Sequence, residues 1–370
     1  MSEISNRTYF VTGGGTGGHI YPAMAVADYL IEKGANVYYV GNRHNMELEL
    51  ATKKGYKFLH VGVKAMPRGK NILKFFTWGT RLLKAILFSI RYIKKYKPDA
   101  VFATGGYVSA PMVFACQITK TPYMMHDCDA MPGLVTRKLC GKAKYVSLAF
   151  ERAKKYIPAR KALVTGNPIR KAFSTLTKEQ ARENLNLKNK LTLTVMGGSQ
   201  GAKSINETVI QLLKEFIQDD NLQIIFQTGK KNYDEILEKV KLIYPSYEND
   251  GGLTLKPYFD DMISVLKASD IVISRAGSLS ISEICASGVV PILVPYPHAA
   301  ANHQRINAKC ILDSGACIYI EDSDLEPNRL RDVIHNLIKN PVKMNYIKQN
   351  SANLAKLDAT EKIVEKLLSL

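Results

Sequence analysis

The chain has 370 residues, of which 46% are hydrophobic, so it is long enough to bury the cores of two domains. No apolar run approaches the ~18 residues that span a bilayer, and the N-terminus lacks the apolar stretch of a signal peptide, so we expect a cytoplasmic protein. The formal net charge of +18 indicates anionic partners: nucleic acid, an anionic membrane surface or phosphorylated substrates. The six cysteines form no CxxC pair, which predicts reduced structural thiols.

A glycine-rich stretch, Val11–His19, follows the short apolar segment Tyr9-Phe10. Beyond it, Ala23–Lys33 has helical periodicity, and Asn36–Val40 is apolar enough for a strand. The order strand, glycine loop, helix, strand predicts a parallel sheet. Because a glycine loop and a helix N-terminus together offer backbone N–H groups and a positive dipole, the loop is typical of phosphate or pyrophosphate sites. His19 lies at the predicted helix start.

The same glycines satisfy GxGxxG at Gly13, Gly15 and Gly18, so a dinucleotide-binding domain is an alternative. That motif requires an acidic residue at the end of the second strand to bind a ribose hydroxyl. Here the strand runs into Gly41-Asn42-Arg43, which contains no acid. A nicotinamide-dependent oxidoreductase is therefore disfavoured, and no GxxxxGK[ST] motif supports a P-loop NTPase.

A strongly basic segment lies between Glu49 and Asp99, where Lys or Arg occurs thirteen times and no other acid occurs. Within it, residues 70–97 interleave aliphatic and aromatic side chains with basic ones at helical spacing. One hypothesis is a core helix with a basic outer surface. Another is a helix that lies on anionic lipid. Nucleic-acid binding is a weaker third interpretation, because no nucleic-acid-binding motif accompanies the patch.

Two further loops follow predicted strands of the first half. The apolar run 98–103 leads into Thr104–Ser109, and Tyr123–Met125 leads into His126–Asp129. In an open parallel sheet, ligands bind outside the carboxyl ends of the strands. For His126 or Asp127 alone a structural role is favoured, and the repetition of the pattern strengthens the case for a functional site at this edge of the sheet.

The order of strand, glycine loop and helix repeats after a turn-forming segment at Thr165–Pro168, where we place a domain boundary. A predicted strand at Leu191–Met196 leads into the glycine loop Gly197–Ala202 and a helix. Later strands lead into polar segments at Arg275–Ser280 and at residues 298–304. We expect an α/β protein with domains at 1–165 and 166–345, and a C-terminal helical segment, 346–370, that packs back on the first domain.

Six motifs along nearly the whole chain resemble the MurG family of glycosyltransferases, which belongs to glycosyltransferase family 28 and has the GT-B fold. The resemblance implies two Rossmann-like domains that face each other across a cleft. The matching motifs are Gly14–His19, Gly105–Ser109, Gly166–Arg170, Gly197–Ala202, Arg275-Ala276-Gly277 with Ser282-Glu283, and Asn302–Gln304.

The resemblance also implies site residues. His19 would be the catalytic base, with a role in acceptor binding as the alternative. The predicted acceptor-binding residues are Gly14, Gly15, Gly105, Gly106, Tyr107 and Ser109. The predicted donor-binding residues are Thr16, Gly17, Gly18, Asp129, Arg170, Ser199, Gln200, Gly201, Glu283, Asn302 and Gln304. No metal and no further cofactor would be required.

The reaction implied is inverting transfer of N-acetylglucosamine from UDP-N-acetylglucosamine to polyprenyl-linked muramyl pentapeptide, at the cytoplasmic face of the bacterial inner membrane. The basic apolar segment would rest on the anionic membrane surface, and no nucleic acid would be bound. Rival hypotheses are a GT-B transferase for another membrane glycolipid and a non-enzymatic basic membrane-binding protein. One departure from the family is Asp129, where relatives commonly carry Asn, so we expect an altered hydrogen bond to the donor sugar there.

Overall fold

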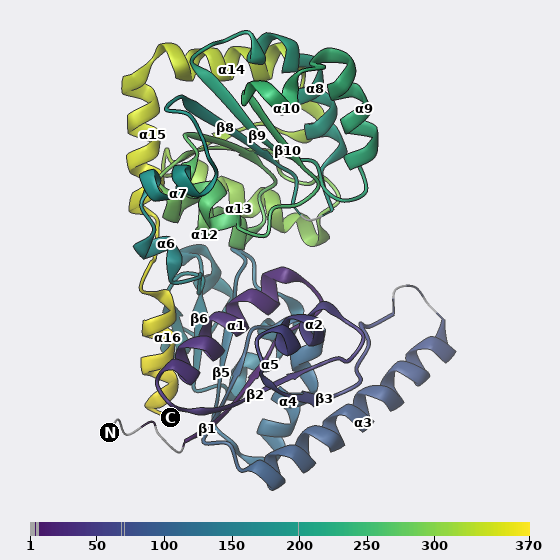
Figure 1. Cartoon of the computed structure of the whole chain (residues 1–370). Helices are drawn as coiled ribbons and strands as arrows, with labels where there is room; N and C mark the ends of the chain where they lie inside the picture. The colour runs from purple at the N-terminus through teal and green to yellow at the C-terminus, as the bar shows by residue number, and fades with distance from the viewer. Residues whose placement is uncertain (1–3, 5–6, 68, 70, 199) are drawn as a thin grey trace. The chain divides into compact units, whose positions relative to one another are not determined.

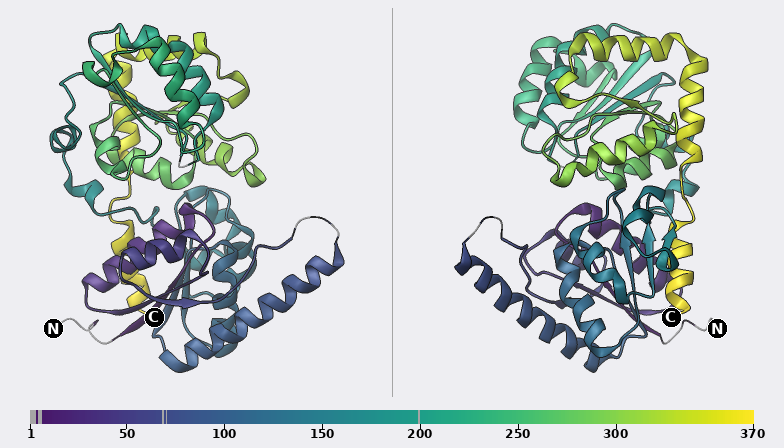
Figure 2. Two further views of the ribbon diagram at one scale, coloured as in Figure 1. Left: turned by 45° about the vertical axis from the view of Figure 1, so that its right-hand side comes forward. Right: turned by 180° about the vertical axis from the view of Figure 1, so that it is seen from behind.

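The structure is a computed structural model and describes Ile4 and residues 7–67, 69, 71–198 and 200–370. It divides the chain into two compact units (Figure 1). The first comprises Met1–Arg170 with Lys356–Leu370, and the second comprises Lys171–Ala355. Each unit contains its own parallel sheet covered by helices on both faces, as Figure 2 shows from two further directions. The α/β class predicted from the sequence is confirmed.

The sheet of the first unit has the order β3-β2-β1-β4-β5-β6-β7 in the described residues, and all its strand pairs are parallel. The sequence patterns did not predict β3, β6 or β7, which are strands of only three or four residues; the edge strand β3, for example, carries Lys57 and His60 and has no long apolar run. The strands are β1 (Thr8–Thr12), β2 (Asn36–Gly41), β3 (Lys57–His60), β4 (Ala100–Ala103), β5 (Tyr123–Asp127), β6 (Tyr145–Leu148) and β7 (Ala162–Val164).

Side chains of this sheet alternate between two cores. Tyr9 and Val11 of β1 pack on one face with α1 and α16, whereas Phe10 packs on the other face with α3 and α4. This alternation is the period-two pattern of a strand that is buried on both sides. The helices are α1 (Gly17–Glu32), α2 (Met46–Lys53), α3 (Ile72–Tyr96), α4 (Gly106–Thr119), α5 (Leu134–Leu139) and α16 (Ala359–Leu368), with short 3₁₀ turns at 140–142, 151–156 and 159–161.

The second unit repeats this architecture around a parallel sheet of order β10-β9-β8-β11-β12-β13. Its strands are β8 (Leu191–Met196), β9 (Leu222–Gln227), β10 (Leu253–Lys256), β11 (Ile271–Ser274), β12 (Val290–Leu293) and β13 (Ile318–Tyr319). Its helices are α6 (Ala172–Thr175), α7 (Lys178–Asn184), α8 (Lys203–Ile217), α9 (Tyr233–Ile243), α10 (Tyr247–Asp250), α11 (Met262–Ala268), α12 (Ser278–Ser287), α13 (His303–Leu312), α14 (Pro327–Lys339) and α15 (Pro341–Asn353), with 3₁₀ turns at 300–302 and 322–324.

The division between the units differs from the predicted boundaries at 165/166 and 345/346. Gly166 stays in the first unit because its N–H group donates to the carbonyl oxygen of Leu148, and Asn167 stays because its side chain bonds to His126. At the other end, α15 continues to Asn353 and belongs to the second unit. Only the segment from Lys356 onward, with α16, returns to the first unit, where α16 packs against α1.

Helix α3 occupies most of the basic segment, as predicted from residues 70–97. Its first turn is capped by Asn71, whose side-chain oxygen accepts from the N–H group of Lys74 at 3.1 Å. One narrow stripe, with Ala85, Ser89 and Ile93, is buried. Leu82, Ile90, Tyr92 and Tyr96 are half-buried against the same core. Further apolar side chains of the helix are exposed: Ile72, Leu73, Phe75, Phe76, Leu83, Leu87 and Phe88. In the described residues, no helix has both the length and the apolar character needed to cross a membrane.

Asp270, at the amino end of β11, forms ion pairs with α7, near the start of the second unit, and with α15, its last helix. Its carboxylate pairs with Lys178 and Arg182 of α7 and with Lys348 of α15, and it accepts the N–H group of Thr192 at 3.0 Å. Burial alone would raise the pKa of Asp270. The hydrogen bonds from these lysines and from the backbone outweigh burial and hold the pKa below its ordinary value.

We expect Asp270→Asn to lower the free energy of unfolding by roughly 3 kcal/mol, because it leaves three partly buried cations without their counter-charge. Since the pKa of the folded carboxyl lies below the unfolded value of about 4, its contribution is present above that pH and is lost as the pH falls below it. Urea unfolding as a function of pH measures this loss. Asp324→Asn is the control, because its ion pair with Arg329 is half-exposed and should contribute less than about 1 kcal/mol. Equal effects of the two substitutions would contradict the assignment.

Candidate active site

The first glycine loop connects β1 to α1 at the carboxyl end of the first sheet. A Cβ on Gly13 would lie 2.6 Å from the carbonyl oxygen of His19, so only glycine fits there. Gly15 has a φ of +88°, and a Cβ on it would lie 2.8 Å from the ring of Tyr107. Gly15 and Thr16 are exposed. The loop therefore presents backbone at the surface where α1 begins, which is the arrangement that favours anions.

A second glycine loop, at the start of α4, contacts the first around His19. Gly105 and Gly106 have φ values of +79° and +69°, which favour glycine. A Cβ on Gly106 would lie 2.8 Å from Cδ2 of His19 and 3.1 Å from the carbonyl oxygen of Gly14. Thr104 fixes the backbone at this point, because its hydroxyl donates to the carbonyl oxygen of His19 at 2.6 Å. The structure thus brings together four predicted site residues from two loops.

Tyr107 and Ser109, both predicted acceptor contacts, have different environments. Tyr107 lies beside Gly15, and its phenol oxygen accepts from the side-chain amide of Asn45 at 3.4 Å. Ser109 is fully buried, and its hydroxyl donates to the carbonyl oxygens of Gly105 and Gly106 at 2.8 and 3.1 Å. The prediction for Ser109 is therefore corrected: this side chain stabilises the first turn of α4 and does not face outward.

His126, at the end of β5, is fully buried in a polar network. Its Nδ1 lies 2.8 Å from Oγ of Ser147 and its Nε2 lies 3.0 Å from Oδ1 of Asn167. Ser147 Oγ in turn lies 2.6 Å from the hydroxyl of Thr165. Burial lowers the pKa of His126 to about 4, so the imidazole is neutral near pH 7. This network gives His126 the structural role favoured from the sequence.

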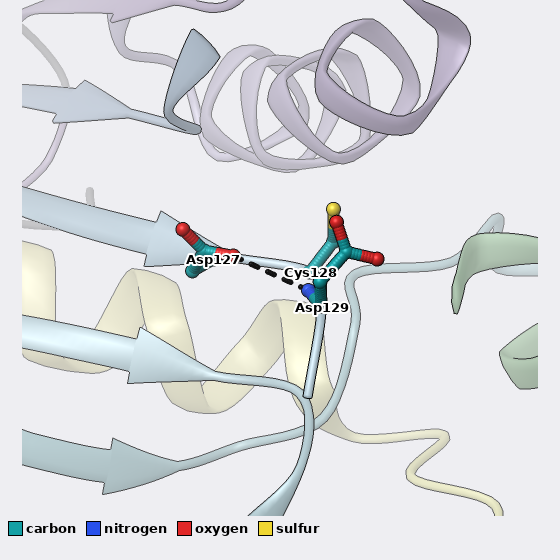
Figure 3. A group of neighbouring side chains, drawn as sticks. All are labelled: Asp127, Cys128 and Asp129. Atoms are coloured by element: carbon teal, nitrogen blue, oxygen red, sulfur yellow. Dashed lines mark hydrogen bonds between the residues drawn. The ribbon is translucent and has the colours of Figure 1, made fainter. Parts of the chain in front are cut away.

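The next three residues form a tight turn at the carboxyl end of β5 (Figure 3). Asp127 accepts the N–H groups of Asp129 at 3.2 Å and of Gly133 at 2.9 Å, and burial raises the pKa of its carboxyl to about 7. Potential metal-ligand atoms of Asp127, Cys128 and Asp129 lie within 4.8 Å of one another. Both oxygens of Asp127 already accept backbone N–H groups, which is the geometry of a turn. Cys128 lies near Gly18, so this turn adjoins the first glycine loop.

In the second unit, the equivalent glycine loop connects β8 to α8. Gly198 and Gly201 have φ values of +82° and +79°, and the N–H group of Gly201 donates to the carbonyl oxygen of Gly198 at 3.0 Å. Gly201 packs backbone to backbone against Gly229, which follows β9. Gln200 is exposed at the loop surface. The predicted donor contact Ser199 lies outside the described residues.

The other predicted donor contacts of this unit follow β11 and β12. Gln304, in the first turn of α13, accepts the N–H groups of Ala276 at 3.2 Å and of Tyr296 at 2.9 Å through its Oε1, which links the two strand ends. Asn302 is exposed and adopts the left-handed conformation, with φ of +54°. Glu283 is half-buried on α12. Of these three side chains, Gln304 is the one that contacts the segments following both β11 and β12.

Two of the matching motifs contain an arginine, Arg170 and Arg275, and a site role was predicted for Arg170. Arg275 is largely buried: its guanidinium pairs with Asp322, donates to Ser204 Oγ at 3.0 Å and donates to the carbonyl oxygen of Val294 at 3.2 Å. It therefore holds the loops of the second unit together. Arg170, a predicted donor contact, is the last residue of the first unit's main segment, Met1–Arg170, and not part of the second unit to which the predicted boundary assigned it.

Sequence patterns missed one residue near the first glycine loop. Glu47 is fully buried in the first turn of α2, and its Oε1 lies 2.6 Å from the position that a Cβ of Gly14 would occupy. An acidic residue in the first turn of a helix usually indicates only a favourable interaction with the helix dipole. Its burial depends on the packing of distant segments, which no local pattern shows.

Both units match known domains. Residues 9–147 match the glycosyltransferase family 28 N-terminal domain, and residues 192–366 match the family's C-terminal domain. The chain is 38% identical to a protein of Halothermothrix orenii over 354 residues, with 93% of this chain and 94% of that protein covered. It is also 38% identical to a protein of Caldanaerobacter subterraneus over 370 residues, with 96% and 98% covered. Both are named UDP-N-acetylglucosamine–N-acetylmuramyl-(pentapeptide) pyrophosphoryl-undecaprenol N-acetylglucosamine transferase.

Solved structures agree with this relationship. The crystal structure of Acinetobacter baumannii MurG is similar with a TM-score of 0.76 and 28% identity, over 99% of this chain and 100% of that one. A UDP-GlcNAc 2-epimerase of Neisseria meningitidis shares the fold alone, with a TM-score of 0.69 and 15% identity over 99% and 100% of the two chains. The glycine loops at the carboxyl ends of two parallel sheets are thus part of a known architecture, and the chain belongs to the MurG family within glycosyltransferase family 28.

Proposed function

We propose that this protein transfers N-acetylglucosamine from UDP-N-acetylglucosamine to polyprenyl-pyrophosphoryl-N-acetylmuramyl pentapeptide, the lipid I to lipid II step of peptidoglycan synthesis. The observation that carries the proposal is the identity of 36–38% to transferases named for this reaction, over 93–98% of the chain. Glycine loops in both units support it, because each suits a phosphate-bearing substrate. The enzyme is therefore assigned as a hexosyltransferase.

The first unit is proposed to bind the acceptor. Its two glycine loops, with Gly14, Gly15, Gly105 and Gly106, place backbone N–H groups and the starts of α1 and α4 around His19. Those groups suit the pyrophosphate of a lipid-linked sugar. Tyr107 adds a phenol beside Gly15. Ser109 is left out of this assignment because its hydroxyl is buried.

The second unit is proposed to bind the donor. The loop with Ser199, Gln200 and Gly201 would hold the diphosphate of UDP, and the carboxylate of Glu283 would accept from the ribose hydroxyls. Asn302 and Gln304 would bind the hydroxyl groups of N-acetylglucosamine. The Oε1 of Gln304 already accepts two backbone N–H groups, so its amide N–H groups are the part that suits a sugar oxygen. From the first unit, Thr16, Gly17, Gly18, Asp129 and Arg170 would complete the donor site.

The proposed chemistry is a single displacement that inverts the anomeric carbon. The acceptor hydroxyl oxygen forms a bond to C1 of N-acetylglucosamine as the bond from C1 to the UDP oxygen breaks. UDP leaves with the bonding electron pair. His19 takes the hydroxyl proton, and its position in the first turn of α1 disfavours imidazolium, which leaves a neutral base near pH 7. No cofactor is needed for this step.

Helix α3 is proposed to rest on the anionic membrane surface that holds the lipid acceptor, at the cytoplasmic face of the inner membrane. One face of α3 packs in the core, as a core helix with a basic outer surface would, but Ile72, Leu73 and Phe76 are 82%, 76% and 69% exposed, so the outer surface is also apolar. Basic side chains accompany them along the helix, and the whole segment lacks acids. Exposed apolar and basic side chains on one helix are the combination that binds anionic lipid.

Transfer of labelled N-acetylglucosamine from its UDP donor to solubilised muramyl pentapeptide lipid tests the proposal directly. We expect turnover with this acceptor and none with diacylglycerol, which represents the rival membrane glycolipid. UDP-N-acetylglucosamine should raise the Tm, whereas NAD should not. Absence of transfer to a properly solubilised muramyl lipid would refute the proposed function.

We expect Asp129→Asn to lower the KM for UDP-N-acetylglucosamine by roughly 2- to 10-fold, the effect of one hydrogen bond of about 0.5–1.5 kcal/mol. The amide would supply a donor that a carboxylate lacks. Steady-state kinetics with varied donor concentration measure the change. Glu151→Gln, at an exposed site of the same unit, serves as the control. Unchanged donor kinetics would argue against any contact between Asp129 and the sugar.

A further inference from the structure

Glu47 lies directly behind the first glycine loop. It is fully buried, and it reaches the loop from the first turn of α2. Its Oε1 occupies the space that a side chain on Gly14 would need, and its Cγ does the same for Gly41 at the end of β2. Tyr39 lies nearby, and its hydroxyl donates to the carbonyl oxygen of Gly13 at 2.7 Å. Burial raises the pKa of Tyr39, and the negative charge of Glu47 raises it further.

One carboxylate oxygen of Glu47 organises the connection from β2 to α2. Oε1 accepts the N–H group of Asn42 at 3.2 Å and the Nδ2 of Asn45 at 3.2 Å. Asn42 is itself fixed, since its side chain exchanges two hydrogen bonds with the backbone of Val63. The buried carboxylate therefore binds a segment that is itself held in place by Val63, and its bond to Nδ2 orients the side-chain amide of Asn45.

The orientation of Asn45 matters because the same Nδ2 also donates to the phenol oxygen of Tyr107 at 3.4 Å. A phenol oxygen that accepts this bond keeps its O–H group for another acceptor. Tyr107 packs against Gly15, so that O–H group lies at the edge of the first glycine loop. The contacts thus run from Glu47 through Asn45 to a hydrogen-bond donor beside the proposed acceptor site.

A second set of contacts leads to His19. Glu47 abuts Gly14, the carbonyl oxygen of Gly14 lies 3.1 Å from the Cβ position of Gly106, and that position lies 2.8 Å from the ring of His19. We propose that Glu47 is a positioning residue for the acceptor: it presents the phenol of Tyr107 through Asn45 and holds Gly14 against the second glycine loop. This inference rests on the proposed function, since it assumes that these loops bind the acceptor.

Glu47→Gln is the informative variant because both hydrogen bonds go to Oε1, and glutamine retains one oxygen to accept them. We expect the weaker, uncharged acceptor to loosen Asn45 and to raise the KM for the muramyl lipid by roughly 5- to 10-fold, as expected for a charge-assisted bond replaced by a neutral one. The KM for UDP-N-acetylglucosamine should stay within about twofold of the wild type, because Glu47 abuts Gly14, whereas the neighbours of the proposed donor residues Gly17 and Gly18 are Tyr21, Thr16 and Cys128. Glu49→Gln is the matched control, since Glu49 is exposed in the same turn of α2.

A double-mutant cycle that combines Glu47→Gln with Tyr107→Phe tests whether Glu47 acts through Asn45 on the phenol of Tyr107. If Glu47 acts through Asn45 on the phenol, the double variant should show an acceptor KM no higher than that of Tyr107→Phe alone. Fully additive effects, equal changes in both KM values, or a Glu47→Gln variant that matches Glu49→Gln would each overturn the inference. Failure of the wild-type enzyme to transfer the sugar would instead refute the proposed function, so the two failures are distinguishable.

Discussion

Replacement of His19 with alanine should lower kcat by roughly 10²- to 10⁴-fold, the usual contribution of a positioned general base. His19 lies in the first turn of α1, where Thr104 fixes its backbone and Gly106 packs against its ring. Loss of the imidazole removes the only group that we assign to take the acceptor's proton. Single-turnover assays with both substrates saturating measure the chemical step without a contribution from binding.

The pH profile separates a base from a residue that only binds the acceptor. In the wild type, kcat should fall on the acid side as the imidazole becomes protonated, and that limb should vanish in His19→Ala. Added imidazole should restore part of the rate. Intact turnover combined with a raised acceptor KM would show that His19 binds the acceptor and is not the base. His126→Gln is a useful comparison, because His126 is buried in a structural network and should mainly affect stability.

The second large effect is expected on the exposed face of α3. Phe76, Leu83 and Leu87 are 69%, 58% and 57% exposed, and their spacing of seven and four residues places them on one face of the helix. Replacement of all three with serine should weaken binding to phosphatidylglycerol-containing vesicles by roughly 10²- to 10⁴-fold. This range corresponds to about 3–6 kcal/mol of lost apolar burial in lipid. Vesicle co-sedimentation measures the effect.

The control replaces Leu242 and Val342 with serine, since both are at least as exposed and lie in the second unit. That variant should bind vesicles like the wild type. Unfolding of both variants should resemble that of the wild type, because exposed side chains contribute little to folding. With a detergent-solubilised short-chain acceptor, the α3 variant should keep its kcat. Equal loss of vesicle binding in the two variants would show that α3 is not the membrane contact.

The sequence predicted the fold class and the position of every glycine loop that the structure describes. These features are local: a strand, a run of glycines and a helix start occupy adjacent residues, and a positive φ selects glycine wherever it occurs. The basic apolar helix, α3, was predicted for the same reason, since its periodicity lies within one segment. The short strands β3, β6, β7 and β10 were missed, because three or four residues, such as the four of β3 with Lys57 and His60, carry no distinctive pattern.

The roles of individual polar side chains were harder to predict. Ser109 occurs in a matching motif, yet its hydroxyl bonds back to its own helix. Arg275 also occurs in a matching motif, and its guanidinium binds Asp322 and Ser204, which links separate segments of the second unit. A motif reports which residue type stands at a position. Its partners come from other segments, and they decide whether the side chain faces a substrate or the protein.

Glu47 shows most clearly which features of the site cannot be predicted from the sequence. The amino-acid sequence by itself determined two strand-loop-helix domains, their glycine loops and a basic helix, because short-range backbone preferences and hydrophobic periodicity specify these features. Only the tertiary structure decided that Glu47 is buried behind Gly14 and that Asn45 joins it to Tyr107, a residue 62 positions further along the chain. Burial and hydrogen-bond partners depend on which distant segments pack together, and that information appears only once the sheet has formed.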